Sequence, residues 1–181
     1  MPAMTDTLEQ MLGQQADRIG AQIGTDEQET RTAISAAIPS LIAALSQEAD
    51  RGSGLRRAIS EDHDGSILDD LPGYLEGTAN LSPRTTNGAG ILEHVLGGQQ
   101  QNVERTLSSK TGLSLDSIAQ LLPLLAPIVM GMLGRKTSTS AAGSEGFGLD
   151  DLGSLLGGEA ATATSRNPEI SDLLASLGQR R

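Results

Sequence analysis

Apolar residues recur at intervals of three and four along most of the first 136 residues, a pattern typical of helices that bury one face. The sequence therefore predicts an all-α fold. The first stripe predicts a helix over about residues 7–23, ended by Gly24, and consists of Leu8, Leu12, Ile19 and Ile23. Thr25 and Gln28 then resemble the capping box of a second helix. Its buried face would carry Ile34, Ile38, Leu41, Ile42 and Leu45.

Shorter helical segments follow in the middle of the chain. A short helix is expected to open at Ser53, and residues 65–77 and 88–98 predict two more, joined by the loop SPRTTNG. A further helix over about residues 99–110 would turn Val103 and Leu107 inward.

The most apolar segment is LLPLLAPIVMGMLG, residues 121–134. A helix that spans a bilayer needs about 20 residues, so this run is too short. Pro123 and Pro127 each remove a backbone donor, which lipid could not replace. We therefore interpret the segment as a buried core helix and expect no membrane span. The sequence leaves open whether Pro39 and Pro127 kink their helices or separate shorter ones.

The apolar segment has an internal counterpart. Residues 24–45, GTDEQETRTAISAAIPSLIAAL, align without a gap on residues 112–133, GLSLDSIAQLLPLLAPIVMGML, at a constant offset of 88 residues. The alignment places Gly24 on Gly112 and Pro39 on Pro127. It predicts either two copies of a helix-turn-helix unit or a single fold with pseudo-symmetry.

The composition of the chain further limits its possible fold, location and partners. A chain of 181 residues buries one modest core, and with only Tyr74 and Phe147 as aromatics that core must be aliphatic. The absence of cysteine excludes disulfides and thiolate metal sites. The first residues lack the pattern of a secretory signal, so a cytoplasmic location is expected. The net charge is −10, and residues 61–100 hold seven acids against one base, so nucleic acid is not an expected partner.

The composition changes after Lys136. Residues 137–181 are rich in Gly, Ser, Thr and Ala, which predicts a flexible tail after a helical domain of residues 1–136. Two short helical motifs, at about residues 149–157 and 168–178, contain DLGSLLG and DLLASLG. They would either dock back on the domain or bind another copy or a partner protein. The candidate interaction residues are Leu149, Leu152, Leu155, Leu156, Ile170, Leu173, Leu174 and Leu177.

No residue pattern indicates catalysis or a cofactor. Residues 60–71 resemble a calcium loop at Asp62 and Asp64, but both defining ends lack the required carboxylates. Neither His63 nor His94 has a second histidine at metal-ligand spacing. No nucleophile elbow or phosphate-binding loop occurs. We therefore expect no enzyme activity, cofactor, metal or small-molecule substrate.

The order of four segments carries a family resemblance. GTDEQETRTAISAAIPSLIAAL, DGSILDDL, NGAGILEHVLGG and TGLSLDSIAQLLPLLAPIVMGMLG together resemble the YidB-like bacterial proteins, a domain of unknown function. The resemblance covers about residues 7–136, and GILEHVLGG and LLPLLAPIVMGML are its most specific pieces. It implies an all-helical bacterial domain with a homeodomain-like arrangement and a Gly-rich tail, and it implies no activity, substrate or catalytic residue.

Two functions remain open on sequence grounds. The first is a non-enzymatic role in protein–protein interaction or self-assembly, through the aliphatic helical domain and the leucine motifs of the tail. The alternative is a DNA-binding regulator that uses the helix-turn-helix-like units. The second helix of each unit, IPSLIAAL or APIVMGML, carries no side chain suited to reading bases, which favours the first function.

Overall fold

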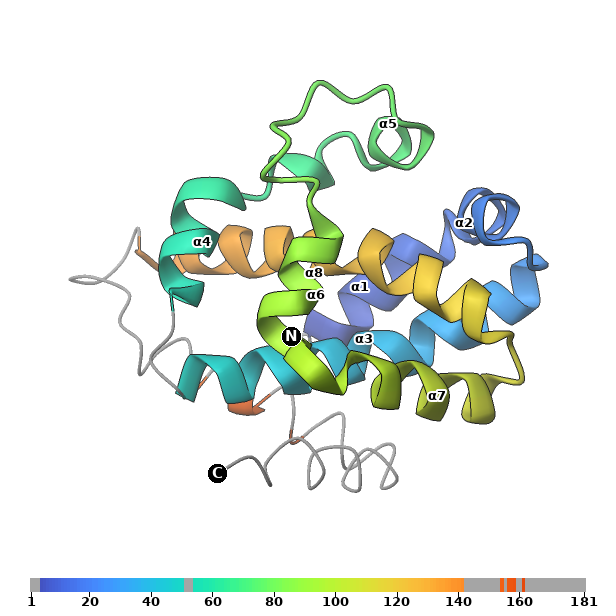
Figure 1. The fold of residues 1–181 in the computed structure, drawn as a ribbon. Coiled ribbons are helices and arrows are strands. Elements are labelled where there is room, and N and C mark those ends of the chain that lie inside the picture. Colours follow the sequence, from blue (N-terminus) through green and yellow to red (C-terminus); the bar gives the residue numbers. More distant parts are fainter. Residues whose placement is uncertain (1–3, 51–53, 142–153, 155, 159–160, 162–181) are drawn as a thin grey trace.

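All the regular elements in the described part of the chain are helices, which confirms the predicted all-α class (Figure 1). The computed structural model describes residues 4–50, 54–141, 154, 156–158 and 161. The elements are α1 (Met4–Gly13), α2 (Ala16–Ile23), α3 (Glu27–Asp50), α4 (Leu55–Asp62), η1 (Ser66–Leu68), α5 (Leu71–Glu76), α6 (Gly88–Leu96), η2 (Gly97–Gln99), α7 (Gln100–Thr111) and α8 (Leu115–Ala141).

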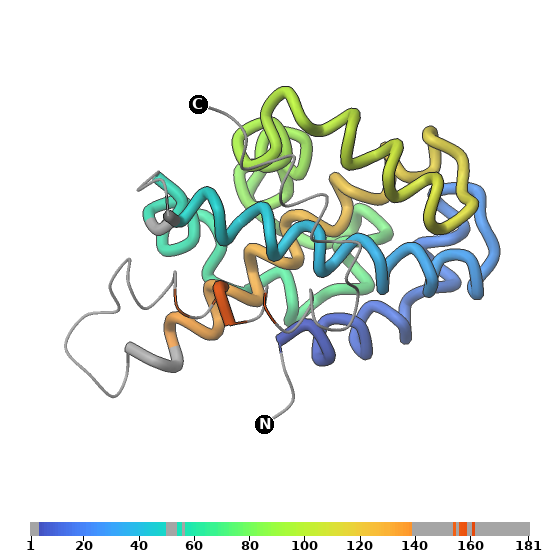
Figure 2. Tube along the Cα trace, turned by 90° about the horizontal axis from the view of Figure 1, so that it is seen from below, coloured from blue at the N-terminus to red at the C-terminus, as the bar shows by residue number. Residues whose placement is uncertain are grey.

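The two longest of these helices, α3 and α8, form the centre of the molecule. They cross in the middle of the fold, as Figure 2 shows, and α1, α2, α4, α6 and α7 each pack against one or both of them. Every residue of 37–46 in α3 and of 125–134 in α8 is buried. Helices that are buried on all sides belong to the interior of a fold, so these two stretches are the core.

The prolines of the central helices do not divide them. α3 continues through Pro39, and α8 continues through both Pro123 and Pro127. A proline inside a helix removes one backbone hydrogen bond, and burial among the surrounding helices offsets that loss. The choice left open by the sequence is therefore answered: both helices are continuous.

The N-terminal stripe forms two helices, so the prediction of one helix over residues 7–23 is wrong. The chain leaves α1 at Gly13 and enters α2 at Ala16, with the Gln15 amide donating to the Leu12 carbonyl. The predicted apolar face is nevertheless correct, because Leu8, Leu12, Ile19 and Ile23 are all buried. Both helices pack on α3, and the break lets the chain change direction over it.

The start of α3 differs from its prediction by one residue. The Asp26 side chain accepts from the Glu29 amide at 2.8 Å, and Glu29 accepts from the Asp26 amide at 3.3 Å. These reciprocal bonds form a capping box of the predicted kind, but the pair is Asp26 and Glu29 rather than Thr25 and Gln28. Thr25 instead pairs its hydroxyl with that of Thr30.

The two aligned segments have matching helix boundaries. α2 ends at Ile23 and α7 ends 88 residues later at Thr111; α3 begins at Glu27 and α8 begins 88 residues later at Leu115. Gly24 and Gly112, which separate the helices of each pair, have left-handed φ values of 73° and 76°. The fully buried stretches of α3 and α8 are also 88 residues apart. The homeodomain-like arrangement implied by the family resemblance stays a prediction.

Helix α8 is long and apolar enough to cross a membrane by length and composition alone. Its candidate span covers Leu115–Ser138, but 78% of the apolar window is buried against the rest of the protein. Burial by other helices agrees with the interpretation of this segment as a core helix. The helix runs on to Ala141, past the predicted domain end at residue 136.

Candidate functional site

Of the eight aliphatic residues predicted to mediate interaction, only Leu156 lies among the described residues. Its side chain has 0% exposure and belongs to the same apolar cluster as the buried residues of the helices. The other predicted interaction residues lie outside the described residues: Leu149, Leu152, Leu155, Ile170, Leu173, Leu174 and Leu177.

Leu156 lies in the interior of the domain, among the buried residues of the apolar cluster. We use the term leucine seat for the buried position of Leu156 in this apolar cluster.

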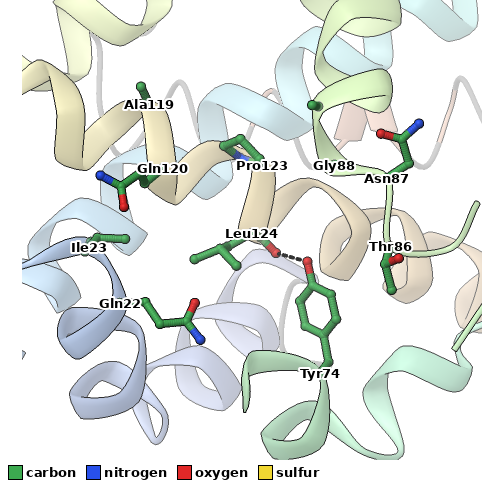
Figure 3. A pocket seen from close by; sticks show the side chains of 11 residues that line it. Gln22, Ile23, Tyr74, Thr86, Asn87, Gly88, Ala119, Gln120, Pro123 and Leu124 are labelled. Carbon is green, nitrogen blue, oxygen red and sulfur yellow. Dashed lines mark hydrogen bonds between the residues drawn. The ribbon is translucent and has the colours of Figure 1, made fainter. Parts of the chain in front are cut away.

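A separate open hollow of about 530 Å³ lies where α2, α5, α6 and α8 meet (Figure 3). Tyr74 extends from α5 and donates its hydroxyl proton to the Leu124 carbonyl at 3.2 Å. Burial raises the pKa of Tyr74 to about 12, so the hydroxyl stays neutral and keeps its proton. Gln22 faces the same space and donates its amide to the Leu75 carbonyl. The described residues that line the hollow carry no charged side chain.

The prolines of α8 shape this hollow. Pro123 has no amide proton, so the Ala119 carbonyl at the hollow lacks its usual donor within the helix. Pro127 has the same effect on the Pro123 carbonyl, and Gly88 packs directly against that oxygen. Asn87 caps α6 at this point by accepting from the Gly90 amide at 3.0 Å. The hollow therefore offers neutral amides, hydroxyls and carbonyls, a surface suited to hydrogen bonding rather than to ion binding.

A second hollow, of about 340 Å³, brings both histidines to the space between α4 and α6. His63 is 3% exposed, and its Nδ1 atom is buried without a hydrogen-bond partner. Burial lowers the pKa of His63, and Asp62 and Asp64 oppose that effect only partly. The imidazole is therefore neutral at neutral pH. His94 lies at the rim, with its side chain 60% exposed and its Nε2 3.8 Å from a Glu48 carboxylate oxygen.

The two histidines differ in how accessible they are. General acid–base catalysis needs a ring nitrogen within hydrogen-bonding reach of the proton that it moves, and the buried Nδ1 of His63 does not meet that condition. In the calcium-like loop, Asp64 accepts from the Ser66 amide at 2.9 Å, which lowers the pKa of Asp64. Among the described residues, no three His, Cys, Asp or Glu side chains lie close enough to hold a metal.

The comparisons with known proteins give one match. A family model described as "Bacterial protein of unknown function (DUF937)" matches residues 6–136. The chain belongs to this family. The match confirms the resemblance to a bacterial family of unknown function that the sequence indicated. No curated protein and no solved structure matches the chain.

The DUF937 match ends before Leu156, the residue that fills the leucine seat. Apart from Met4 and Leu156, the buried residues of the apolar cluster lie inside residues 6–136, as do both hollows, whereas Leu156 lies beyond the match. Sequence reasoning identified Leu156 and its motif but missed the hollows. The spacing of Pro123 and Pro127 was the one available signal, because each proline frees a carbonyl one helical turn earlier. Gln22 and Tyr74 are far from these prolines in the sequence, and no sequence pattern indicated that they line the same hollow.

Proposed function

We propose that this DUF937 protein is a non-enzymatic, cytoplasmic interaction protein that binds partner proteins, including further copies of itself, through its leucine seat and tail motifs. The observation that supports this proposal is the complete burial of the Leu156 side chain. A leucine from outside the family domain fills a position in the domain's own apolar cluster. A domain that accepts a leucine from a separate segment of its own chain has the chemistry to accept one from another chain.

The expected strength of such a contact fits reversible binding. Burying one leucine side chain contributes about 1.5–3 kcal/mol, too little for a stable complex after the cost of association. Neighbouring aliphatic residues of the motif add further buried area when the motif forms a helix on the seat. The affinity of a single motif for a single seat is therefore low, and binding increases when many copies are held at high local concentration.

Light scattering after size exclusion tests the proposal on the full chain, from micromolar to millimolar protein. We expect the mass to rise with concentration, and to rise less for Leu156→Ala and Leu177→Ala together. Ala163→Ser, a small change between the motifs, is the control. A constant monomer mass at every concentration, with no binding of the labelled chain to an unlabelled excess, would overturn self-association.

We do not propose the DNA-binding alternative. In each helix-turn-helix-like unit the second helix is buried over residues 37–46 or 125–134, so that part of the helix cannot enter a DNA groove. The same samples give a direct check, because a DNA binder associates with duplex DNA at low salt and releases it steeply as salt rises.

A further inference from the structure

The tail contains a second copy of the motif that fills the leucine seat. Residues 149–157 align on residues 170–178 at an offset of 21 residues. Leu152 falls on Leu173, Leu156 falls on Leu177, and a glycine follows the last leucine in both copies. Both copies also keep an aspartate directly before their first matched leucine. Leu177 is therefore the chemical equivalent of Leu156, which is buried.

We propose that Leu177 of one copy occupies the leucine seat of a second copy, and that Leu156 competes with it by filling the seat from within its own chain. This inference rests on the proposed function and names the partner and its regulation. The first motif is an internal plug, and the second is the segment that links copies.

The chain lengths allow this arrangement. The 21 residues from Leu156 to Leu177 reach at most about 70 Å when extended. A domain the size of residues 6–136 is about 35–40 Å across. The second motif can therefore reach the seat of a neighbouring domain even while the first motif remains in its own seat.

Leu156 is the usual occupant of the leucine seat because it is tethered to the same domain. A segment joined by a short flexible linker has an effective concentration in the millimolar range. Residues 142–153, which join α8 to Ser154, have the Gly-rich composition of such a linker. At lower protein concentration Leu156 therefore outcompetes Leu177 of another copy for a seat that accepts either. Assembly follows when protein is concentrated or when the plug is removed.

The contact is head-to-tail, because a seat on one copy meets a tail on the next. Such heterologous contacts form rings or open chains rather than closed twofold dimers. Assembly should therefore produce a ladder of masses that lengthens with concentration.

A labelled peptide of residues 168–178 tests the competition directly, by fluorescence anisotropy against the full chain. We expect it to bind the Leu156→Asp variant at least about tenfold more tightly than the wild type, because the aspartate empties the seat. A peptide with Leu177→Asp is the matched control and should bind neither protein. Equal binding to wild type and variant would overturn the competition, and binding to neither would overturn the seat as the site of Leu177.

Light scattering on the same full-length variants separates this inference from the proposed function. We expect Leu156→Asp to assemble at lower concentration than wild type, Leu177→Asp to stay monomeric, and Ala163→Asp to behave as wild type. If Leu177→Asp assembles as wild type does, another surface links the copies and only this inference fails. If no form self-associates and the peptide does not bind, both fail. Circular dichroism confirms folding, and Leu156→Ala replaces Leu156→Asp if the aspartate unfolds the domain.

Discussion

At the scale of single residues, two glycines set the distance between elements. A methyl group at Gly88 would overlap the carbonyl oxygen of Pro123, and one at Gly134 would overlap the carbonyl oxygen of His63. In both places backbone packs on backbone, so no flexible side chain can move aside. The first contact brings the start of α6 against α8, and the second brings the end of α4 against α8.

We expect Gly88→Ala and Gly134→Ala each to lower the free energy of unfolding by about 1–3 kcal/mol or more, the usual cost of overpacking a core. Gly54→Ala is the matched control, since a methyl group there meets nothing within 4 Å and φ is −65°. Urea denaturation measures all three. A Gly88→Ala protein as stable as the Gly54→Ala protein would show that α6 can move away from α8 at no cost.

His63 makes the stability depend on pH. Burial lowers its pKa in the folded protein below the value of about 6.5 in the unfolded chain. The unfolded state therefore binds more protons in this range, so stability is complete above about pH 6.5 and falls as the pH drops toward the folded pKa. Burial is the larger influence, and the neighbouring carboxylates of Asp62 and Asp64 limit how far the pKa of His63 falls.

We expect His63→Gln to reduce the loss of unfolding free energy between about pH 7.5 and pH 5.5, because glutamine does not titrate. His94→Gln, the same substitution at a side chain that is 60% exposed, is the control. Chemical denaturation at the two pH values gives the comparison. An unchanged pH dependence in His63→Gln would assign the effect to other groups.

At the scale of elements, local sequence placed the end of α2 correctly and the start of α3 one residue early. Gly24 and Gly112 end α2 and α7 because a left-handed residue after a helix favours glycine, a local rule. The start of α3 was placed one residue early because Thr25 and Asp26 are both good capping residues. The fold decided between them, since Thr25 bonds to Thr30 and leaves Asp26 to cap the helix.

The capping box of α3 gives a prediction that separates these alternatives. Asp26→Ala should lower the free energy of unfolding by about 1 kcal/mol, the usual cost of losing a helix cap. Gln28→Ala, at the position that the sequence assigned to the box, should change it by less than about 0.5 kcal/mol because its side chain is exposed. Thermal denaturation of the two variants suffices. Equal losses would count against the Asp26 box.

At the scale of the whole molecule, Leu156 joins the apolar cluster of the helices from beyond the family match. A chain ending at Ala141 loses Leu156 from the apolar cluster, and we expect its free energy of unfolding to fall by about 1.5–3 kcal/mol. A chain ending at Ala161 keeps that residue and should match the full length. Urea denaturation at low protein concentration avoids any contribution from assembly. Equal stability of the two truncated chains would mean that Leu156 adds nothing to the folded domain.

The sequence by itself determined the helical class, the inward faces and the 88-residue correspondence, because these depend on residue spacing and on local glycine geometry. Leu8, Ile34, Val103 and Leu107 are buried as their periodicity predicted. The tertiary structure alone decided the break after α1, the burial of His63, the contact of Gly88 with Pro123 and the seat of Leu156. Each of these depends on segments distant in sequence that meet only once the chain has folded, so no local pattern encodes them.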